Sequence, residues 1–512
     1  MVKAIMIQGT MSNAGKSLLC AGLCRVFRQD GYRVRPFKAQ NMALNSYITA
    51  EGLEMGRAQA VQAEACGVAP SVRMNPILLK PVSDGSSQVI VNGEVRGNMR
   101  AADYFAAKRS LQPDILRAYR SLAAEADIMV IEGAGSPAEI NLKQDDIVNM
   151  SMARLADAPV ILVGDIDRGG VFAQLYGTIA LLSAQEQAMV KAVVINKFRG
   201  DAALLKPGLA QLATLTGKPV AGVLPYLEVD IEDEDSLADR LQRRHSDALI
   251  DIAVIRLPRI SNFTDFAVLE CREEVSLRYV SKAGDFGNPD LVILPGSKNT
   301  MEDLLWLRQS GLEGKVLRHA SSGKPVFGIC GGYQMLGEEI LDPEGVERGG
   351  TIKAMGLLPA VTVFENTKRR TRVTGRFGEV NGILKAMSGA KLDGYEIHMG
   401  KTIFSDKDAA DHKMMVQICD QVTGESRWDG AQKKNVYGCY VHGIFDDREV
   451  ADALIGALLE EKGYGEEAMH SMDYHAYKEK QYQILANAVR ENMDMKKIYE
   501  IIEKGNAAEC FI

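Results

Sequence analysis

Short apolar runs alternate with longer amphipathic stretches through the first half of the chain. The apolar runs are rich in Val and Ile, as the buried strands of a parallel sheet are, and they read AIMIQG, RVRPF, DIMVIEGAG, APVILVGDID and KAVVINKF. Helical periodicity lies between them, in KSLLCAGLCRVFRQDG and IVNMSMARLADA. This alternation predicts βαβ units and a parallel sheet.

A polar, acidic stretch at residues 227–249, LEVDIEDEDSLADRLQRRHSDAL, ends this first pattern. A second βαβ pattern follows in DIAVIRLPR, DLVILPGS and KPVFGICGG, and the end of the chain has helical patterns in ADALIGALLEE and YQILANAVREN. We therefore predict an α/β protein with one domain at 1–246, a second at 251–447 and a helical C-terminal tail at 448–512.

The charge balance and the cysteines narrow the class of protein. The 512 residues hold 60 Lys and Arg against 67 Asp and Glu, a net charge of −7 that gives no general attraction to nucleic acid or anionic lipid. No apolar run is long enough to span a bilayer, and the strand-like start VKAIMIQG leaves no room for a signal peptide. The eight cysteines contain no CxxC pair, which argues against a structural zinc site and a disulfide framework. We expect a cytoplasmic protein that acts on small molecules and binds neither nucleic acid nor membrane.

A glycine-rich turn, QGTMSNAGKS, follows the first predicted strand. The usual phosphate loop has four residues between its glycines, whereas five separate Gly9 from Gly15 here. The essential parts remain: a turn that directs backbone N–H groups and a helix N-terminus at phosphates, Lys16 as a cation and Ser17 as a hydroxyl ligand for Mg²⁺. The sequence thus predicts ATP and Mg²⁺ binding, and the alternative is an ordinary turn with a chance GKS. The other predicted ATP-binding residues of this loop are Thr10, Asn13 and Ala14.

The longer loop resembles that of the dethiobiotin synthetase family, whose members use ATP to activate a carboxylate. VIEGAGS resembles the family's E-G-A-G motif, which makes Glu132 a candidate Mg²⁺ ligand; alternatively it is a strand-end carboxylate facing water. VVINKF places Asn196 at the end of a later strand. The resemblance implies that Asn196 reads the adenine edge, and the alternative is a plain turn former.

A second candidate site lies in KPVFGICGGYQMLG. Cys330 stands between Gly328 and Gly332, and a nucleophile on a tight strand-to-helix turn needs small neighbours. The segment resembles the G-x-C-x-G-x-Q elbow of class I glutamine amidotransferases. That resemblance implies an oxyanion hole made by the N–H groups of Gly296 and Gly331. A buried core cysteine is the alternative.

His442, in NVYGCYVHGIFDD, is the candidate catalytic base for this cysteine. Most class I relatives continue as His-x-Glu, but Ile444 stands at the glutamate position, and Asp446 and Asp447 cannot be assigned the role from their spacing. The departure resembles the cobyrinate and cobyrate amidotransferases, which work with a Cys–His pair. His398, in GYEIHMG, is either a loop residue beside the site or a structural histidine.

Nearly the whole chain resembles the cobyric acid synthase family. The resemblance rests on QGTMSNAGKS, PFKAQNMALNS, NPILLKP, RISNFTDF and GYEIHMG, besides the two catalytic motifs. It implies ATP- and glutamine-dependent amidation of the b, d, e and g carboxylates of a corrinoid, adenosylcobyrinic acid a,c-diamide, through acyl phosphates. Residues expected to hold phosphate or carboxylate groups, or else to form polar loops, are Lys38, Gln40, Asn41, Asn45 and Lys80. The segment EDEDS (232–236) also resembles a family motif, and an acidic linker is the alternative.

Two other functions stay open at this point. One is a related ligase, such as cobyrinic acid a,c-diamide synthase or an enzyme that amidates a cell-wall precursor. The other is a P-loop ATPase switch whose glutaminase-like domain only binds a ligand.

Overall fold

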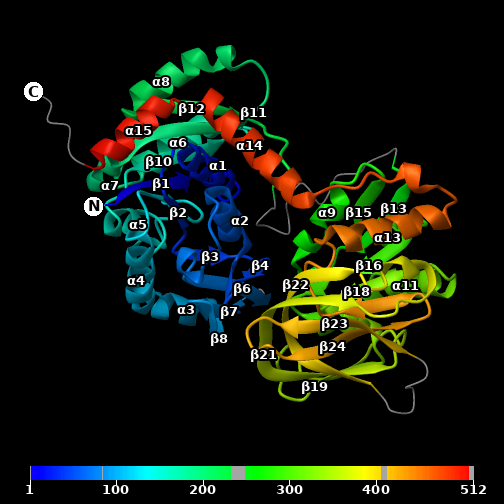
Figure 1. The fold of residues 1–512 in the computed structure, drawn as a ribbon. Coiled ribbons are helices and arrows are strands. Elements are labelled where there is room, and N and C mark those ends of the chain that lie inside the picture. The colour runs from blue at the N-terminus through cyan, green and yellow to red at the C-terminus, as the bar shows by residue number, and fades with distance from the viewer. Residues whose placement is uncertain (1, 84, 232–247, 405–411, 507–512) are drawn as a thin grey trace, which may run out of the picture. The chain divides into compact units, whose positions relative to one another are not determined.

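The computed structural model describes residues 2–83, 85–231, 248–404 and 412–506, so EDEDS lies outside the described residues. The chain forms two compact units. The first unit contains Met1–Ala43, Met55–Ile231 and Lys478–Ile512, and the second contains Leu44–Glu54 and Glu232–Tyr477. A short N-terminal segment thus belongs to the second unit, and the C-terminal residues belong to the first (Figure 1).

The first unit is built on a six-stranded sheet with the order β12-β11-β10-β1-β9-β2. All of its neighbouring strands pair in parallel, which confirms the predicted parallel sheet. The strands are β1 (Lys3–Gly9), β2 (Val34–Phe37), β9 (Ile128–Glu132), β10 (Val160–Asp165), β11 (Val190–Phe198) and β12 (Val220–Pro225). Because the strands are parallel, the loops after β1 and β9 meet at the same edge of the sheet.

The helices of the first unit include those expected between these strands. They are α1 (Lys16–Gln29), α2 (Arg57–Cys66), α3 (Ala101–Ala107), α4 (Gln112–Ala123), α5 (Met150–Leu155), α6 (Val171–Ala180), α7 (Ala184–Met189) and α8 (Lys206–Thr216). A four-stranded sheet with the order β3-β6-β7-β8 was not predicted. Its strands are β3 (Gln40–Met42), β6 (Ile77–Ser83), β7 (Ser86–Val91) and β8 (Glu94–Arg100).

Residues 448–512 divide between the two units. Helix α13 (Arg448–Glu461) belongs to the second unit, whereas most of α14 (Tyr474–Asn492) and all of α15 (Met495–Lys504) belong to the first. Leu485, Val489 and Ile498 join the core that α1 and the parallel sheet form. The contact with α1 is close, because a Cβ on Gly22 would lie 2.7 Å from Val489 Cγ2.

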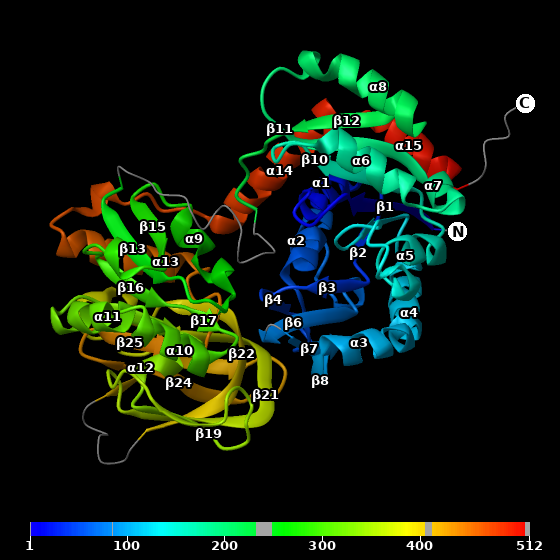
Figure 2. The same cartoon turned by 180° about the vertical axis from the view of Figure 1, so that it is seen from behind.

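The second unit contains a mixed sheet of eleven strands (Figure 2). Five strands pair in parallel and confirm the second βαβ pattern: β13 (Ile250–Ile255), β15 (Val275–Val280), β16 (Leu291–Leu294), β18 (Val326–Ile329) and β25 (Val436–Cys439). The other six extend the sheet largely by antiparallel pairs, which the sequence did not predict. These are β19 (Glu339–Asp342), β20 (Gly350–Lys353), β21 (Ala360–Phe377), β22 (Lys391–Phe404), β23 (Lys413–Asp420) and β24 (Ser426–Lys433).

Short elements complete the second unit. Its remaining helices are α9 (Ala267–Glu270), α10 (Thr300–Gln309), α11 (Leu312–Ser321) and α12 (Gly331–Leu336), with a 3₁₀ turn η6 (Phe263–Phe266). Strand β14 (Ile260–Ser261) pairs with β17 (Gly296–Ser297). The short strand β4 (Ser46–Ile48) pairs with β5 (Glu54–Gly56), at the end of the segment that joins the second unit. In the described part of the chain, no helix has the length and apolar character needed to cross a membrane.

Candidate functional site

The predicted phosphate loop connects the end of β1 to the start of α1. Asn13 and Gly15 have φ angles of 59° and 88°, in the left-handed region. A Cβ on Gly15 would lie 2.0 Å from Asn196 Nδ2, so only glycine fits there. The Asn196 amide donates to the Ala14 carbonyl oxygen at 3.0 Å, and Thr10 Oγ1 donates to Gln174 Oε1 at 3.1 Å. Asn196 of β11 and Gln174 of α6 therefore hold the loop from outside it.

Lys16 folds back over this loop. Its Nζ donates to the carbonyl oxygens of Met11, at 2.9 Å, and Gly135, at 3.3 Å. A Cβ on Gly9 would lie 2.9 Å from the same Nζ, so the first glycine of the motif leaves room for the lysine. The ammonium is thus placed between the phosphate loop and the E-G-A-G turn.

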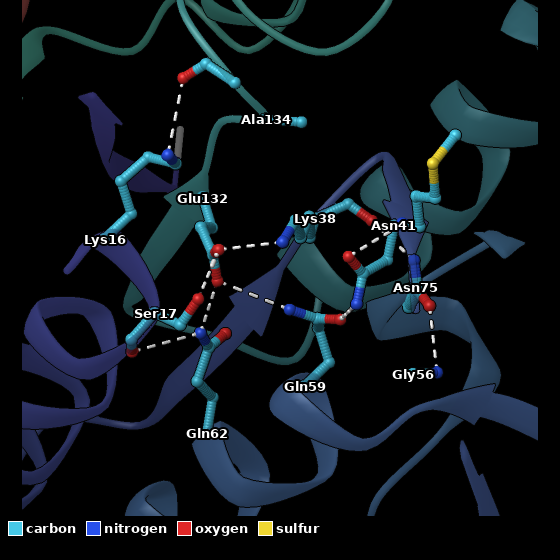
Figure 3. Close-up of polar contacts among 12 residues, drawn as sticks. Lys16, Ser17, Lys38, Asn41, Gly56, Gln59, Gln62, Asn75, Glu132 and Ala134 are labelled. Atoms are coloured by element: carbon cyan, nitrogen blue, oxygen red, sulfur yellow. Dashed lines mark hydrogen bonds and ion pairs between the residues drawn. The ribbon is translucent and has the colours of Figure 1, made fainter. Parts of the chain in front are cut away.

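Glu132 is the centre of a buried cluster of polar side chains (Figure 3). Its Oε1 accepts hydrogen bonds from Ser17 Oγ at 2.7 Å and from Lys38 Nζ at 2.8 Å. Its Oε2 accepts from Gln62 Nε2 at 2.6 Å and from Gln59 Nε2 at 3.3 Å. The residue is 1% exposed, so the alternative of a carboxylate facing water is wrong. A buried charge of this kind needs such donors to be tolerated.

Sequence reasoning missed Gln59 and Gln62. They lie three residues apart on one face of α2, a spacing that places both side chains on the same partner. That spacing is the only signal in the sequence, and it is common in helices that have no functional role.

The KAQNM and NPILLKP segments meet beside Glu132. Asn41 Nδ2 donates to Gln59 Oε1 at 3.1 Å, and Asn75 Nδ2 donates to the Lys38 carbonyl oxygen at 3.2 Å. Asn75 Oδ1 also accepts from the backbone N–H of Gly56, where α2 begins, at 3.0 Å. The candidate cation Lys38 is therefore fixed both at its backbone and at its ammonium group.

The other three predicted substrate residues are placed differently. Gln40 Oε1 accepts a hydrogen bond from the Tyr104 hydroxyl, and Lys80 is buried in β6. Asn45 lies in the second unit, where its Oδ1 accepts from the backbone N–H of Phe263 at 3.3 Å.

Cys330 occupies the tight turn between β18 and α12. Its φ of 51° and ψ of −108° lie outside the regions that non-glycine residues usually adopt. A Cβ on Gly332 would lie 2.0 Å from the Leu294 carbonyl oxygen, and one on Gly328 would lie 2.6 Å from Leu336 Cδ1. The predicted need for small neighbours is confirmed, because backbone and core atoms fill the space beside both glycines.

Gly332→Ala is expected to destabilise the second unit by about 3 kcal/mol or more, because its methyl group would overlap a backbone carbonyl. Gly314→Ala is the matched control, since helix α11 has open space there. In that helix alanine should raise the free energy of unfolding by about 0.5–1 kcal/mol. Both tryptophans, Trp306 and Trp428, lie in the second unit. Urea unfolding followed by tryptophan fluorescence therefore measures both changes, and an unshifted midpoint for Gly332→Ala would contradict the prediction.

His442 lies close enough to Cys330 for the two side chains to interact electrostatically. The His442 Nδ1 atom is 2.7 Å from Asp265 Oδ2, and both side chains are almost fully buried. Burial opposes a charge on the ring, but Asp265 and Cys330 outweigh it and raise the pKa of His442 to about 10. The imidazole is therefore protonated at neutral pH. Sequence reasoning missed Asp265, although it lies in the RISNFTDF segment.

The two glycines predicted for the oxyanion hole lie against this pair. A Cβ on Gly296 would lie 3.0 Å from His442 Cε1, and one on Gly331 would lie 2.8 Å from the backbone nitrogen of Ser297. The structure therefore brings β17 and the start of α12 together next to the cysteine.

His398 is a strand residue of β22 rather than a loop residue. Its ring stacks on Tyr440 with 3.8 Å between the centroids, and its Nδ1 lies 3.1 Å from the Gly400 carbonyl oxygen. Burial lowers the pKa of His398 to about 3, so the ring is neutral. It is adjacent to Ile397, whose carbonyl oxygen is 3.6 Å from Cys330 Sγ. The prediction that it lies beside the site agrees with this position.

Comparison with known proteins adds family matches over both halves of the chain. Residues 251–450 match the family described as "CobB/CobQ-like glutamine amidotransferase domain", and residues 5–237 match the "CobQ/CobB/MinD/ParA nucleotide binding domain".

Curated relatives match almost end to end. The chain is 59% identical to "Cobyric acid synthase" of Ruminiclostridium cellulolyticum, over 99% of this chain and 98% of that protein. It is 56% identical to the protein of the same name from Lachnoclostridium phytofermentans, over 99% and 100% of the two chains. It is 51% identical to that of Yersinia enterocolitica, over 98% of each chain.

Proposed function

The chain belongs to the cobyric acid synthase family, and on that premise we propose that it is a glutamine-hydrolysing amide ligase acting on adenosylcobyrinic acid a,c-diamide. It uses ATP and glutamine to convert the b, d, e and g carboxylates to amides in cobalamin biosynthesis. The observation that carries the proposal is the presence, on one chain, of a phosphate loop facing a buried glutamate and a cysteine on a strained turn near a buried histidine.

The first unit activates the carboxylate. The backbone of residues 9–17 binds the ATP phosphates, and Lys16 stabilises the phosphoryl group as it passes to the substrate carboxylate. Lys38 and Asn41 are the proposed contacts of the acceptor carboxylate, since they lie on the far side of Glu132 from the loop (Figure 3). Gln40, Lys80 and Asn45 remain weaker candidates, and Asn196 is the proposed contact of the adenine.

The donor set fits Mg²⁺. Ser17 Oγ and Glu132 Oε1 are hard oxygen ligands 2.7 Å apart, next to the phosphate loop. Among the described residues there is no group of three or more His, Cys, Asp or Glu side chains that could hold a metal ion. One hydroxyl and one carboxylate suit an ion that is otherwise held by phosphates and water. When bound, Mg²⁺ neutralises charge that develops on the phosphates.

The second unit releases ammonia from glutamine. The Cys330 thiolate attacks the amide carbon, and backbone N–H groups at Gly296 and Gly331 stabilise the oxyanion. His442 gives its proton to the departing nitrogen, which leaves as ammonia, and then takes a proton from the water that hydrolyses the thioester. The ammonia displaces phosphate from the acyl phosphate and forms the amide.

We propose the cytoplasm as the location, because this chemistry needs a reduced thiol. The seven cysteines in the described part of the chain are thiols rather than disulfide partners, and thiols persist in a reducing compartment.

Mass spectrometry of the product tests the proposed function. Incubation with the diamide, ATP and glutamine should give a corrinoid in which four carboxyl groups have become amides. Amidation of the a and c carboxylates of cobyrinic acid instead would identify a cobyrinic acid a,c-diamide synthase. ATP hydrolysis without any amide product would support the P-loop switch.

A further inference from the structure

We propose that Asp265 is the positioning residue for His442 in the glutaminase reaction, in place of the glutamate of His-x-Glu enzymes. The inference rests on the proposed function of Cys330 and His442, and it adds the residue that orients the imidazole.

The Asp265 carboxylate contacts both the His442 ring and the backbone of the next residue, Gly443. Oδ2 is 2.7 Å from the ring Nδ1, and Oδ1 accepts a hydrogen bond from the backbone N–H of Gly443 at 2.9 Å. A carboxylate next to Nδ1 requires the proton to be on that atom. The other ring nitrogen, Nε2, is then the one that can give and take a proton in the reaction. Asp265 thus fixes the orientation of the ring, and it keeps the proton on Nδ1 once Nε2 has given up its own.

The residues that follow His442 in the sequence have other structural roles. Ile444, at the usual glutamate position, is fully buried in the apolar core of the second unit. Asp447 caps helix α13, where its side chain accepts from the backbone N–H of Glu449 at 2.8 Å. The Asp265 carboxylate, by contrast, forms an ion pair with His442.

The turn that carries Asp265 is itself tightly held. The backbone N–H of Asp265 donates to the Asn262 carbonyl oxygen at 3.0 Å, and Asn262 adopts a left-handed conformation with φ of 51°. Asn262 Nδ2 lies 3.4 Å from His442 Nε2, and its Oδ1 accepts from the backbone N–H of Ser46 at 3.1 Å. A fixed turn can orient a ring, whereas a mobile carboxylate could not.

The turn that carries Asp265 follows directly on strand β14, which pairs with the strand of the proposed oxyanion hole. Strand β14 ends at Ser261 and pairs with β17, which contains Gly296. Residues 260–266 therefore connect the strand that stabilises the oxyanion to the carboxylate that orients the base. The geometry of both depends on this one segment.

The charge of Asp265 has a measurable consequence for His442. The titratable side chains that face the ring are Asp265, Cys330 and Tyr395, whose ring stacks on it with 5.3 Å between the centroids, and His398 is within electrostatic range. Asp265 and Cys330 raise the pKa of His442. Removing the Asp265 charge therefore lowers that pKa, and the protonated imidazole is lost at a lower pH.

The test is the pH profile of glutaminase activity in Asp265→Asn. We expect kcat to fall by about 10²–10⁴-fold with little change in KM, since the amide permits the wrong tautomer. The alkaline limb of kcat/KM should move to lower pH by at least about one unit. Amidation driven by free ammonia should stay at the wild-type rate.

Asp342→Asn is the matched control. Asp342 is another buried aspartate of the second unit, and it accepts backbone hydrogen bonds from Val346, Glu347 and Gly349. A purely structural aspartate should change stability without moving the alkaline limb. If Asp265→Asn does not fold by tryptophan fluorescence, Asp265→Glu replaces it, and the retained charge should keep the alkaline limb at its wild-type pH.

Two results would overturn the proposal while leaving the proposed function intact. One is an Asp265→Asn enzyme with kcat within about threefold of wild type and an unmoved alkaline limb. The other is an Asp265→Glu enzyme whose alkaline limb shifts despite the retained charge. A wild-type enzyme without cysteine-dependent glutaminase activity would instead contradict the proposed function itself.

Discussion

Replacing Cys330 with alanine is expected to abolish glutamine-dependent amidation and to leave ammonia-dependent amidation near the wild-type rate. The Cys330 thiol is the proposed nucleophile that forms the thioester, and loss of a nucleophile typically costs at least about 10³-fold in kcat. Free ammonia bypasses this step, because the acyl phosphate is made at the phosphate loop of the first unit. Product formation is measured with glutamine and with an ammonium salt in parallel.

Cys419→Ala is the control for this experiment. Cys419 is a free cysteine of the same unit, in β23, and its thiol makes only weak contacts at 3.9 Å to backbone oxygens. This variant should retain both activities. Persistent glutamine hydrolysis in Cys330→Ala would exclude Cys330 as the nucleophile.

Replacing Lys16 with alanine is expected to abolish amidation with either nitrogen source. The lysine lies between the phosphate loop and the E-G-A-G turn, held by two carbonyl oxygens. Losing such a positioned cation from phosphoryl transfer should lower the rate by about 10²–10³-fold or more. Release of inorganic phosphate and formation of amide are followed with glutamine and with ammonia.

Lys206→Ala removes an exposed lysine at the start of α8 and serves as the control, with activity near wild type. The comparison with Cys330→Ala is the decisive one. If ammonia restores neither variant, the division of labour between the two units is wrong. If ammonia restores Lys16→Ala, carboxylate activation does not depend on this loop.

The parts of the sites that could be predicted are those whose geometry is set by residues adjacent in the sequence. The phosphate loop and the cysteine elbow are each a strand, a turn and a helix in succession. The geometry around Gly9 and Lys16 in the loop, and around Cys330 in the elbow, therefore follows from residues close by in the sequence. Glu132 could also be predicted from the sequence, because it ends a buried strand.

The missed residues act across long separations in sequence or lack a distinctive pattern. Asp265 meets His442 across 177 positions, and no local pattern pairs them. Strand β8 was missed because it is largely exposed and presents no apolar stripe to the core. Asn45 lies only three positions after Met42 of KAQNM, so the sequence grouped it with that segment, although the chain passes to the second unit at Leu44.

The packing of α14 and α15 has a consequence for the order in which the protein folds during synthesis. The core of the first unit needs Leu485, Val489 and Ile498, which are synthesised after the whole of the second unit. The second unit ends at Tyr477 and can be complete before they emerge. Domains usually fold in the order of their synthesis, N-terminal first. Here the unit that begins first is completed only after the second unit, and until then the face of α1 around Gly22 lacks its partner helix. A nascent chain that is stalled when Tyr477 has emerged, with Lys478 onward still inside the ribosome, should therefore present a folded second unit and a protease-sensitive first unit.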